Sequence, residues 1–258
     1  MSCRFEVTEE QWNWMEPILR PVRRPDGKGR PPADTRRVLN GVLWILGTGA
    51  QWRELPPEYG PFQTVHGRFQ HWVREGKLEQ VLHRLSEELY AQGKLKLAEA
   101  FIDATFAPAK KGGFAIGPTK RGKGTKIMAI ADQHGLPLAL TVEPASPHES
   151  RLIESTLAAS FLDELPERLI GDKAYDSDGL DRQLAEDYGI EMIAPHRRNR
   201  RKTQDNRPLR RYLRRWKIER LFAWLGAYRR IVTRWEFHVH NFLGMVQLAC
   251  AMLLLRHL

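Results

Sequence analysis

The chain of 258 residues is poor in cysteine, having only Cys3 and Cys250 near its opposite ends. Two isolated cysteines form neither a disulfide framework nor a thiolate zinc site, so we expect a protein of the reducing cytoplasm. The N-terminus lacks the apolar core of a secretory signal peptide. The longest apolar run, residues 242–255, is interrupted by Gly244 and Gln247 and is shorter than the roughly 18 residues of a membrane span. We therefore expect no membrane partner and predict a buried helix for this run.

Acidic residues are scarce in two stretches of a chain whose formal net charge is +10. Residues 197–230 contain fourteen basic and two acidic residues, which leaves 27 basic and 29 acidic residues elsewhere. A basic block with interleaved aromatic residues favours a folded nucleic-acid surface, although a solvated helix face is the simpler alternative. The second stretch has no acid between Asp103 and Asp132, and predicts a mobile glycine-rich loop or a surface of solvated lysines. Its basic residues are Lys110, Lys111, Lys120, Arg121, Lys123 and Lys126.

The first 95 residues follow helical patterns, with helices predicted at 8–19, from the cap Asp34 to Gly47 and Gly49, at 63–74 and at 78–90. Short helices joined by tight turns permit a helix-turn-helix motif, with residues 63–74 as its recognition helix. Packing of three helices without any DNA contact agrees with this pattern equally well.

From about residue 96 the patterns change to strands that alternate with helices. Strands are predicted at 98–106, 126–131, 136–142, 168–170 and 190–194, and helices at 150–162, 177–187 and 205–228. Strands in a hairpin run, followed by strands alternating with helices, predict a mixed α/β sheet flanked by helices. We therefore predict an all-α helical domain over residues 1–95 and an α/β domain over residues 96–258.

Three carboxylates have positions that suit catalysis. Asp103 lies in an apolar strand, Asp172 follows the strand at 168–170, and Glu219 is surrounded by arginines. A carboxylate in a buried strand is costly unless it is paired or bound to a metal. Oxygen ligands suit Mg²⁺ or Mn²⁺, and three carboxylates can hold two ions roughly 4 Å apart for phosphodiester chemistry. The ordinary alternatives are an edge-strand acid, a turn residue and a helical Arg215–Glu219 pair.

A helical face around Glu219 extends this hypothesis. Tyr212, Arg215 and Glu219 are separated by three and four residues and therefore share one face of the predicted helix. Arg215 could bind a phosphate through two hydrogen bonds, or form only a structural salt bridge. Other polar candidates are weaker: His238 and His240 alternate as on a strand, and His148 is best explained as a helix cap.

These residues resemble the three catalytic blocks of the DDE transposases of bacterial insertion sequences, in the insertion-sequence-five group. The blocks are Ile102 to Thr105, Gly171 to Asp176, and Tyr212 to Leu225. Residues 51–56 and 64–72 resemble the helical leader domain of the same group. The resemblance therefore covers nearly the whole chain.

The resemblance implies a ribonuclease-H-like core that uses two Mg²⁺ ions, with Mn²⁺ as a substitute, to cut transposon ends and join them to target DNA. It implies that Asp103, Asp172 and Glu219 are the catalytic acids and the metal ligands. It further implies double-stranded DNA as the partner, a homodimer, and a cytoplasmic protein at the bacterial nucleoid. We expect DNA contacts from Tyr212, Arg215, Lys173, Arg211, Arg214, Arg220 and Lys126.

One position departs from the signature of this family. The signature has a basic residue seven positions after the glutamate, where this chain has Gly226, so that Arg229 or Arg230 would have to supply the charge. Two alternatives therefore stay open: a catalytically inactive DNA-binding protein derived from a transposase, and a structure-specific nuclease of the same fold that cuts without joining.

Overall fold

The computed structural model describes residues 5–21, 31–197 and 210–258. Most of the linker predicted at 21–32, the start of the helix predicted at 205–228, and Cys3 lie outside these residues. The helices are α1 (Glu9–Leu19), α2 (Thr35–Thr48), α3 (Phe62–Arg74), α4 (Lys77–Ala91), α5 (Ile153–Ala158), α6 (Asp178–Tyr188), α7 (Trp216–Gly226), α8 (Arg229–Val232) and α9 (Val239–Leu254). The strands are β1 (Ala100–Pro108), β2 (Gly117–Thr119), β3 (Gly122–Asp132), β4 (Pro137–Pro144), β5 (Arg168–Ile170) and β6 (Glu191–Ile193).

Helices with local capping signals form where the sequence predicts them. Thr8 and Gln11 make the reciprocal hydrogen bonds of a capping box at the start of α1. The side chain of Asp34 accepts a hydrogen bond from the backbone amide of Arg37 at the start of α2. This helix ends at Gly49, which is left-handed with φ 71°. Gly47, also predicted to end it, lies inside the helix, where a β-carbon would be 2.0 Å from Phe5 Cε1.

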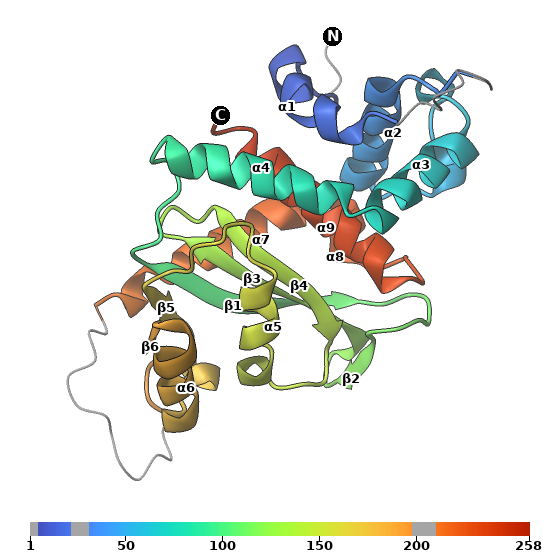
Figure 1. Cartoon of the computed structure of the whole chain (residues 1–258). Coiled ribbons are helices and arrows are strands. Elements are labelled where there is room, and N and C mark those ends of the chain that lie inside the picture. The colour runs from blue at the N-terminus through green and yellow to red at the C-terminus, as the bar shows by residue number, and fades with distance from the viewer. Residues whose placement is uncertain (1–4, 22–30, 198–209) are drawn as a thin grey trace.

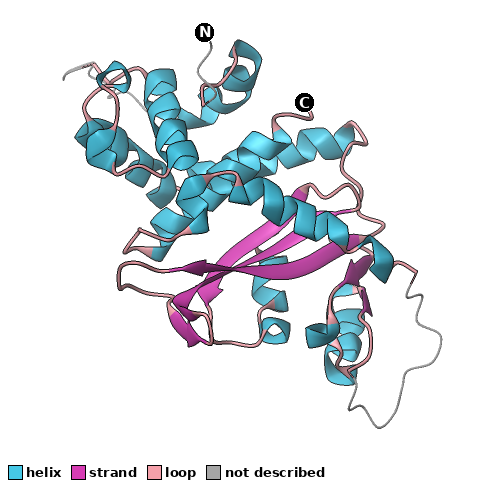
Figure 2. Cartoon of the chain, turned by 180° about the vertical axis from the view of Figure 1, so that it is seen from behind, coloured by secondary structure: helices cyan, strands magenta, loops and turns pink. Residues whose placement is uncertain are grey.

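The six strands form one mixed sheet in the order β2-β3-β1-β5-β6, with β4 also paired to β3. Strand β3 is antiparallel to β1, β2 and β4, whereas β5 is parallel to β1 and β6 is parallel to β5. Helices α7 and α9 cover one face of the sheet, and α5 lies against the other (Figures 1 and 2). The predicted mixed α/β sheet flanked by helices, preceded by an all-α region, is therefore confirmed.

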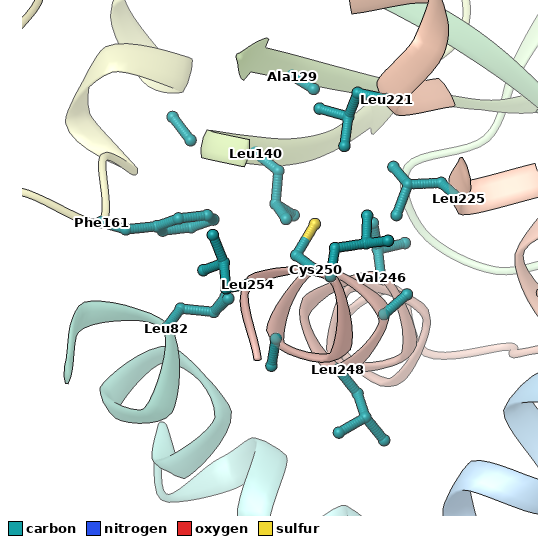
Figure 3. Packing of buried hydrophobic residues seen from close by; sticks show 14 of the residues in the cluster. Leu82, Ala129, Leu140, Phe161, Leu221, Leu225, Val246, Leu248, Cys250 and Leu254 are labelled. Atoms are coloured by element: carbon teal, nitrogen blue, oxygen red, sulfur yellow. The ribbon is translucent and has the colours of Figure 1, made fainter. Parts of the chain in front are cut away.

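Helix α9 joins the N-terminal helices to the sheet in a single core. It packs against α3 and α4 on one side and against β4 on the other. Figure 3 shows Cys250 of α9 next to Leu140 of β4, with Leu254 of the same helix next to Leu82 of α4. The predicted burial of this apolar run is confirmed. Among the residues that the structure describes, no helix is both long and apolar enough to span a membrane.

Four predicted segments differ because long-range pairing decides their structure. The segment predicted as a glycine-rich loop contains β2, which pairs with β3. The helix predicted at 150–162 is reduced to a 3₁₀ turn (Glu149–Arg151) and α5, because Phe161 then donates a backbone hydrogen bond of 2.8 Å to Leu138 of β4. In place of the predicted long helix, residues 210–228 form a 3₁₀ turn (Tyr212–Arg214) and α7. His238 and His240 lie at the start of α9 rather than on a strand.

Candidate active site

Parallel strands β1 and β5 bring two of the three predicted acids to matching positions along the strand direction. The last residues that these strands pair are Phe101 and Ile170. Asp103 lies two residues beyond Phe101, and Asp172 lies two residues beyond Ile170. Since paired residues of parallel strands project from the same face, the two aspartates occupy equivalent positions where β5 diverges from β1.

Asp103 is held by charge and by the backbone in a largely desolvated position. Its Oδ2 is 2.6 Å from Arg215 Nη1, and its Oδ1 accepts a 2.9 Å hydrogen bond from the amide of Ala104. Burial raises the pKa of Asp103 above its usual value, although the Ala104 amide and the Arg215 guanidinium act in the opposite direction. Keeping the Asp103 carboxylate ionised therefore costs free energy, even with Arg215 and the Ala104 amide beside it.

Arg215 connects Asp103 to the third acid. Its Nη2 is 2.9 Å from Oε1 of Glu219, and its guanidinium lies 6.0 Å from the ring centre of Tyr212. Burial alone would lower the pKa of Arg215, but the Asp103 carboxylate raises it above its usual value. The shared face predicted for Tyr212, Arg215 and Glu219 is confirmed by these contacts. The simpler alternative, an Arg215–Glu219 salt bridge, is also present.

The loop after β5 fixes Asp172 through its own backbone. Asp172 Oδ1 accepts a 2.7 Å hydrogen bond from the Ala174 amide and so caps a 3₁₀ turn (Lys173–Tyr175). Arg197 closes this turn from outside, with Nε 2.9 Å from the carbonyl of Lys173 and Nη2 2.7 Å from that of Ala174. The amide of Arg197 also donates to Asp176 Oδ2 at 2.8 Å. Asp172 is thus positioned by a rigid turn rather than by a partner charge.

Tyr175 is a buried polar group beside these acids. Its hydroxyl is buried and has no hydrogen-bond partner among the described residues. Burial raises the pKa of Tyr175 well above its usual value, and the charges of Glu149, Asp103 and Asp172 raise it further. A buried hydroxyl without a partner is rare in folded proteins, so Tyr175 has a hydrogen-bonding capacity that the described side chains do not meet.

The donor groups at this site have the chemistry that a divalent cation requires. Mg²⁺ and Mn²⁺ prefer oxygen donors, which the carboxylates of Asp103, Asp172 and Glu219 would supply. Among the described residues, no three His, Cys, Asp or Glu side chains are grouped closely enough to hold an ion as they stand. The guanidinium of Arg215 lies between Asp103 and Glu219 instead. The residues therefore fit a divalent cation, provided that Arg215 releases Asp103.

Several basic residues predicted to contact DNA are paired within the protein. Arg211 and Arg214 both form ion pairs with Glu99, which is 4% exposed, and Arg214 Nη2 is 2.6 Å from Glu99 Oε2. Lys126 Nζ is 3.3 Å from Oε1 of Glu149 and donates a 2.8 Å hydrogen bond to the carbonyl of Pro147. DNA contacts from these three residues remain predictions, and each would compete with a carboxylate.

Arg220 and Lys173 differ in their surroundings. The guanidinium of Arg220 lies 4.9 Å from the ring centre of Trp216 and 4.8 Å from that of Trp224, and it donates to the carbonyl of His134. Lys173 is exposed at the rim of the turn that holds Asp172. Lys173 is therefore free of the packing that fixes Arg220.

The position that departs from the family signature is open to solvent. Gly226 ends α7, is exposed, and has no atom within 4 Å of where a β-carbon would lie. Arg230 is buried, with Nε 2.7 Å from Glu236 Oε1, so the expectation that it supplies the missing charge is wrong. Arg229 is exposed at the start of α8, just after the end of α7.

Sequence reasoning missed four residues of the site: Glu99, Glu149, Tyr175 and Arg197. Tyr175 lies inside the second family block, and its place close behind Asp172 was the available signal. The pairing of Glu99 with Arg214 joins residues 115 positions apart, so no local pattern predicts it. His148 behaves as predicted: it precedes a 3₁₀ turn and accepts a hydrogen bond from the Ser150 amide at 3.4 Å.

Two protein families account for most of the chain. Residues 96–254 match the family described as "Transposase DDE domain", and residues 7–82 match the one described as "Putative transposase of IS4/5 family". The match over residues 96–254, more than half of the chain, thus shows a transposase with a DDE domain. The chain belongs to the transposases of the IS4/5 type of bacterial insertion sequences, which confirms the resemblance seen in its sequence blocks.

Relatives at the level of sequence include proteins of named insertion elements. The chain is 35% identical over 135 residues to "Putative transposase for insertion sequence element IS6501" of Brucella ovis, covering 51% of this chain and 98% of that protein. It is 32% identical over 117 residues to "Insertion element IS402 uncharacterized 16.2 kDa protein" of Burkholderia cepacia, covering 44% and 80%. Among solved structures, the Mos1 strand transfer complex matches 66% of this chain and 60% of that chain, with 14% identity and a TM-score of 0.27. A TM-score this low identifies no common backbone arrangement.

Proposed function

We propose that this chain cuts the ends of an insertion element with the help of divalent cations and joins the freed 3′-hydroxyl to target DNA. The observation that carries the proposal is the constellation of Asp103, Arg215 and Glu219, with Asp172 at an equivalent level on the neighbouring strand. We further propose that residues 1–95 form a DNA-binding domain and residues 96–258 the catalytic domain.

Asp103, Asp172 and Glu219 are the groups that would hold the divalent cations. Such ions, when bound, activate the attacking water or hydroxyl and stabilise the leaving oxygen of a phosphodiester. The protein contributes a rigid position for each carboxylate: a central strand for Asp103, a closed turn for Asp172 and the first turns of α7 for Glu219. Because Tyr175 is buried beside the aspartates, it excludes water from that side of the site.

Arg215 has two roles in this proposal. With no cation bound, it neutralises Asp103 and Glu219, whose carboxylates would otherwise face one another without compensation. Were Asp103 to hold a divalent cation, it would no longer pair with the Arg215 guanidinium. The guanidinium can then bind a DNA phosphate next to the carboxylates through two parallel hydrogen bonds. We propose that Lys173, which is exposed next to Asp172 in the chain, contacts the same DNA strand.

Two transposon ends have to be cut together, so we propose a homodimer or a larger assembly on double-stranded DNA.

The reaction is tested with a plasmid that carries a marker between the two ends of the element encoding this chain. Purified protein with Mg²⁺ or Mn²⁺ should release the marker. Asp103→Asn, Asp172→Asn and Glu219→Gln should each abolish release while DNA binding persists. Asp187→Asn, at an exposed position of α6, is the matched control and should cut normally. Normal cutting by one of the three site variants would remove that residue from the proposed triad.

Gly226 stands where the family signature has a basic residue. The alternative to a cutting enzyme is therefore a chain that binds DNA without cutting it. A β-carbon at Gly226 would have no atom within 4 Å, so a substitution there starts in open space. Gly226→Lys would restore the basic residue of the family signature. If the natural chain does not cut and Gly226→Lys does, the chain is an inactive derivative. Strand transfer from pre-cut ends separates a transposase from a nuclease that only cuts.

A further inference from the structure

Three large apolar side chains stand exposed together beyond the far end of β1. Phe114 is 72% exposed, Phe237 is 51% exposed and Trp235 is 43% exposed. We call these three residues the aromatic platform. Folded proteins rarely leave neighbouring aromatic side chains in water unless they serve as a binding surface. The loop that carries Phe114 leaves the sheet on the side away from α6 (Figure 1).

A buried arginine builds this platform. Arg234 is only 1% exposed, and its Nη2 donates to the carbonyls of both Phe114 (2.8 Å) and Phe237 (3.1 Å). The same guanidinium donates to Thr125 Oγ1 at 2.6 Å and to the carbonyls of Ala115 and Glu236 at 3.1 and 3.0 Å. One side chain therefore fixes two loops against each other and sets the backbones of both phenylalanines.

The backbone of the two loops supports the same arrangement. The Arg234 amide donates to the carbonyl of Pro108 at 2.9 Å, and the Lys110 amide donates to the carbonyl of Arg234 at 3.0 Å. A β-carbon at Gly113, which has φ 141°, would lie 2.1 Å from the carbonyl oxygen of Phe237. Only glycine permits this approach. These contacts hold the two loops of the aromatic platform in a defined position against each other.

The charge around the platform identifies a polyanion as its partner. The segment of residues 110–123, which we call the basic hairpin, contains Phe114 and ends in the β2–β3 turn. It has five exposed cationic side chains and no acid: Lys110, Lys111, Lys120, Arg121 and Lys123. A second copy of this hairpin would be repelled by so much like charge, whereas a nucleic-acid backbone would be attracted.

The position of the platform relative to Asp103 fits duplex DNA. Ala109 follows Asp103 by six positions along β1 and its end, which at about 3.3 Å per residue is about 20 Å. That length corresponds to about six base pairs at about 3.4 Å each. A cleft of about 430 Å³ lies between β1 and the basic turn, and is lined by Ala104, Thr105, Phe106, Lys120, Arg121 and Lys126 among others. The cleft begins at Ala104, the residue after Asp103, and reaches the basic hairpin at Lys120 and Arg121.

We infer that the aromatic platform and the basic hairpin bind duplex DNA about six base pairs from the phosphate that is cut, at about 3.4 Å per base pair. The cationic side chains contact phosphates, and Phe114 and Phe237 press against the minor groove, where apolar wedges are known to act. This inference rests on the proposed function, because Asp103 is taken as the site of cutting.

Photo-crosslinking distinguishes DNA from a second protein copy as the partner. The photoreactive amino acid p-benzoylphenylalanine is introduced in place of Phe114, and in a control in place of Tyr188, an aromatic residue of α6 that is 37% exposed. Helix α6 packs on β6, at the edge of the sheet opposite to β2. With a labelled duplex of mixed sequence, position 114 should crosslink to DNA and position 188 should not. Crosslinking of position 114 to another copy of the chain, or to neither, would overturn the inference.

Salt dependence separates the two kinds of contact. Lys110→Gln with Lys111→Gln should reduce the slope of log binding constant against log salt by about 0.9 for each phosphate that is no longer neutralised. Phe114→Ala should weaken binding about tenfold with an unchanged slope, equivalent to about 1.4 kcal/mol. An unchanged affinity in both variants would overturn the inference. If the natural chain cuts plasmid ends while position 114 never touches DNA, the inference fails and the proposed function stands. The reverse result would reject the proposed function and the stated distance to a cut phosphate, while the DNA-binding surface would stand.

Discussion

Glu99 forms ion pairs with Arg211 and Arg214, and the carboxylate is much more deeply buried than the two arginines. We therefore expect removal of the arginine charges to cost more stability than removal of the carboxylate. Glu99 is 4% exposed directly before β1, while the side chains of Arg211 and Arg214 are 32% and 43% exposed. Removal of both arginine charges leaves a buried carboxylate without compensation. Removal of the carboxylate leaves two guanidinium groups that can turn into water. The two perturbations therefore differ in cost although they break the same ion pairs.

The magnitudes follow from this difference in burial. Breaking a buried ion pair so that one charge is stranded costs about 3–5 kcal/mol, so Arg211→Gln with Arg214→Gln should lower the free energy of unfolding by about 3 kcal/mol. Glu99→Gln removes charge-assisted hydrogen bonds but strands no charge, and should cost about 1 kcal/mol. The triple variant should recover most of the stability that the arginine pair of substitutions removes, because the buried charge is then absent.

Urea unfolding followed by tryptophan fluorescence measures these differences, with the double-mutant cycle giving the coupling. In a thermal scan, a decrease of about 3 kcal/mol corresponds to about 6–12 °C for a chain of this size. The reasoning is refuted if Glu99→Gln costs as much as the arginine pair, or if the triple variant is as unstable as the arginine pair. Glu167→Gln, at an exposed acid just before β5, is the matched control and should change stability little.

The substitution Glu99→Gln should also change DNA binding. Glu99→Gln releases Arg211 and Arg214 from their carboxylate and makes both guanidinium groups available to phosphates. The slope of log binding constant against log salt should then steepen by about 0.9 for each additional phosphate that is neutralised. An unchanged slope would show that these arginines point away from the DNA even when they are unpaired.

Three further predictions concern single positions. Arg215→Gln removes the charge that competes for Asp103, so Mn²⁺ should raise the melting temperature of this variant more than that of the natural chain; an equal rise would contradict the competition. His66 is stacked 4.4 Å from Trp52, and burial and then the charge of Arg230 lower its pKa. The unfolded state therefore binds the proton more readily, and stability should fall as the pH drops below about 6.5, a decrease that His66→Gln should reduce. Gly171→Ala should cost about 1–3 kcal/mol in urea unfolding, because its β-carbon would lie 2.5 Å from Tyr175 Cδ2.

Elements with local signals were predictable from the sequence, and elements made by distant pairing were not. The cap at Asp34 and the turn from Asp132 to Gly135 are formed by residues a few positions apart, so their patterns were sufficient. Strand β2 has only three residues, two of them Gly117 and Pro118, and no strand propensity of its own. It exists because β3 offers unpaired backbone groups beside it.

The candidate site shows the same division. Asp103 and Asp172 come to equivalent positions because β1 and β5 pair in parallel up to Phe101 and Ile170, and the sequence shows both strands. Whether a carboxylate faces a cation, a guanidinium or water depends on how distant segments of the chain pack. Asp103 faces Arg215, which lies 112 positions later in the chain. Such pairing is a property of the packed molecule, so the arginine between two of the three acids was not predictable from spacing.

The distribution of arginines changes where DNA is expected to lie. Within the described part of the basic stretch, most arginines donate to protein groups, and their charges are partly compensated there: Arg197, Arg211, Arg214, Arg215, Arg220 and Arg230. The basic hairpin, by contrast, has five exposed cations and no acid. Because phosphate binding depends on charges that are not already neutralised, the hairpin should contribute more to the salt slope than an equal number of arginines from the stretch. A larger slope change on neutralising Arg214 and Arg220, which donate to protein groups, than on neutralising Lys110 and Lys111 would contradict this ranking.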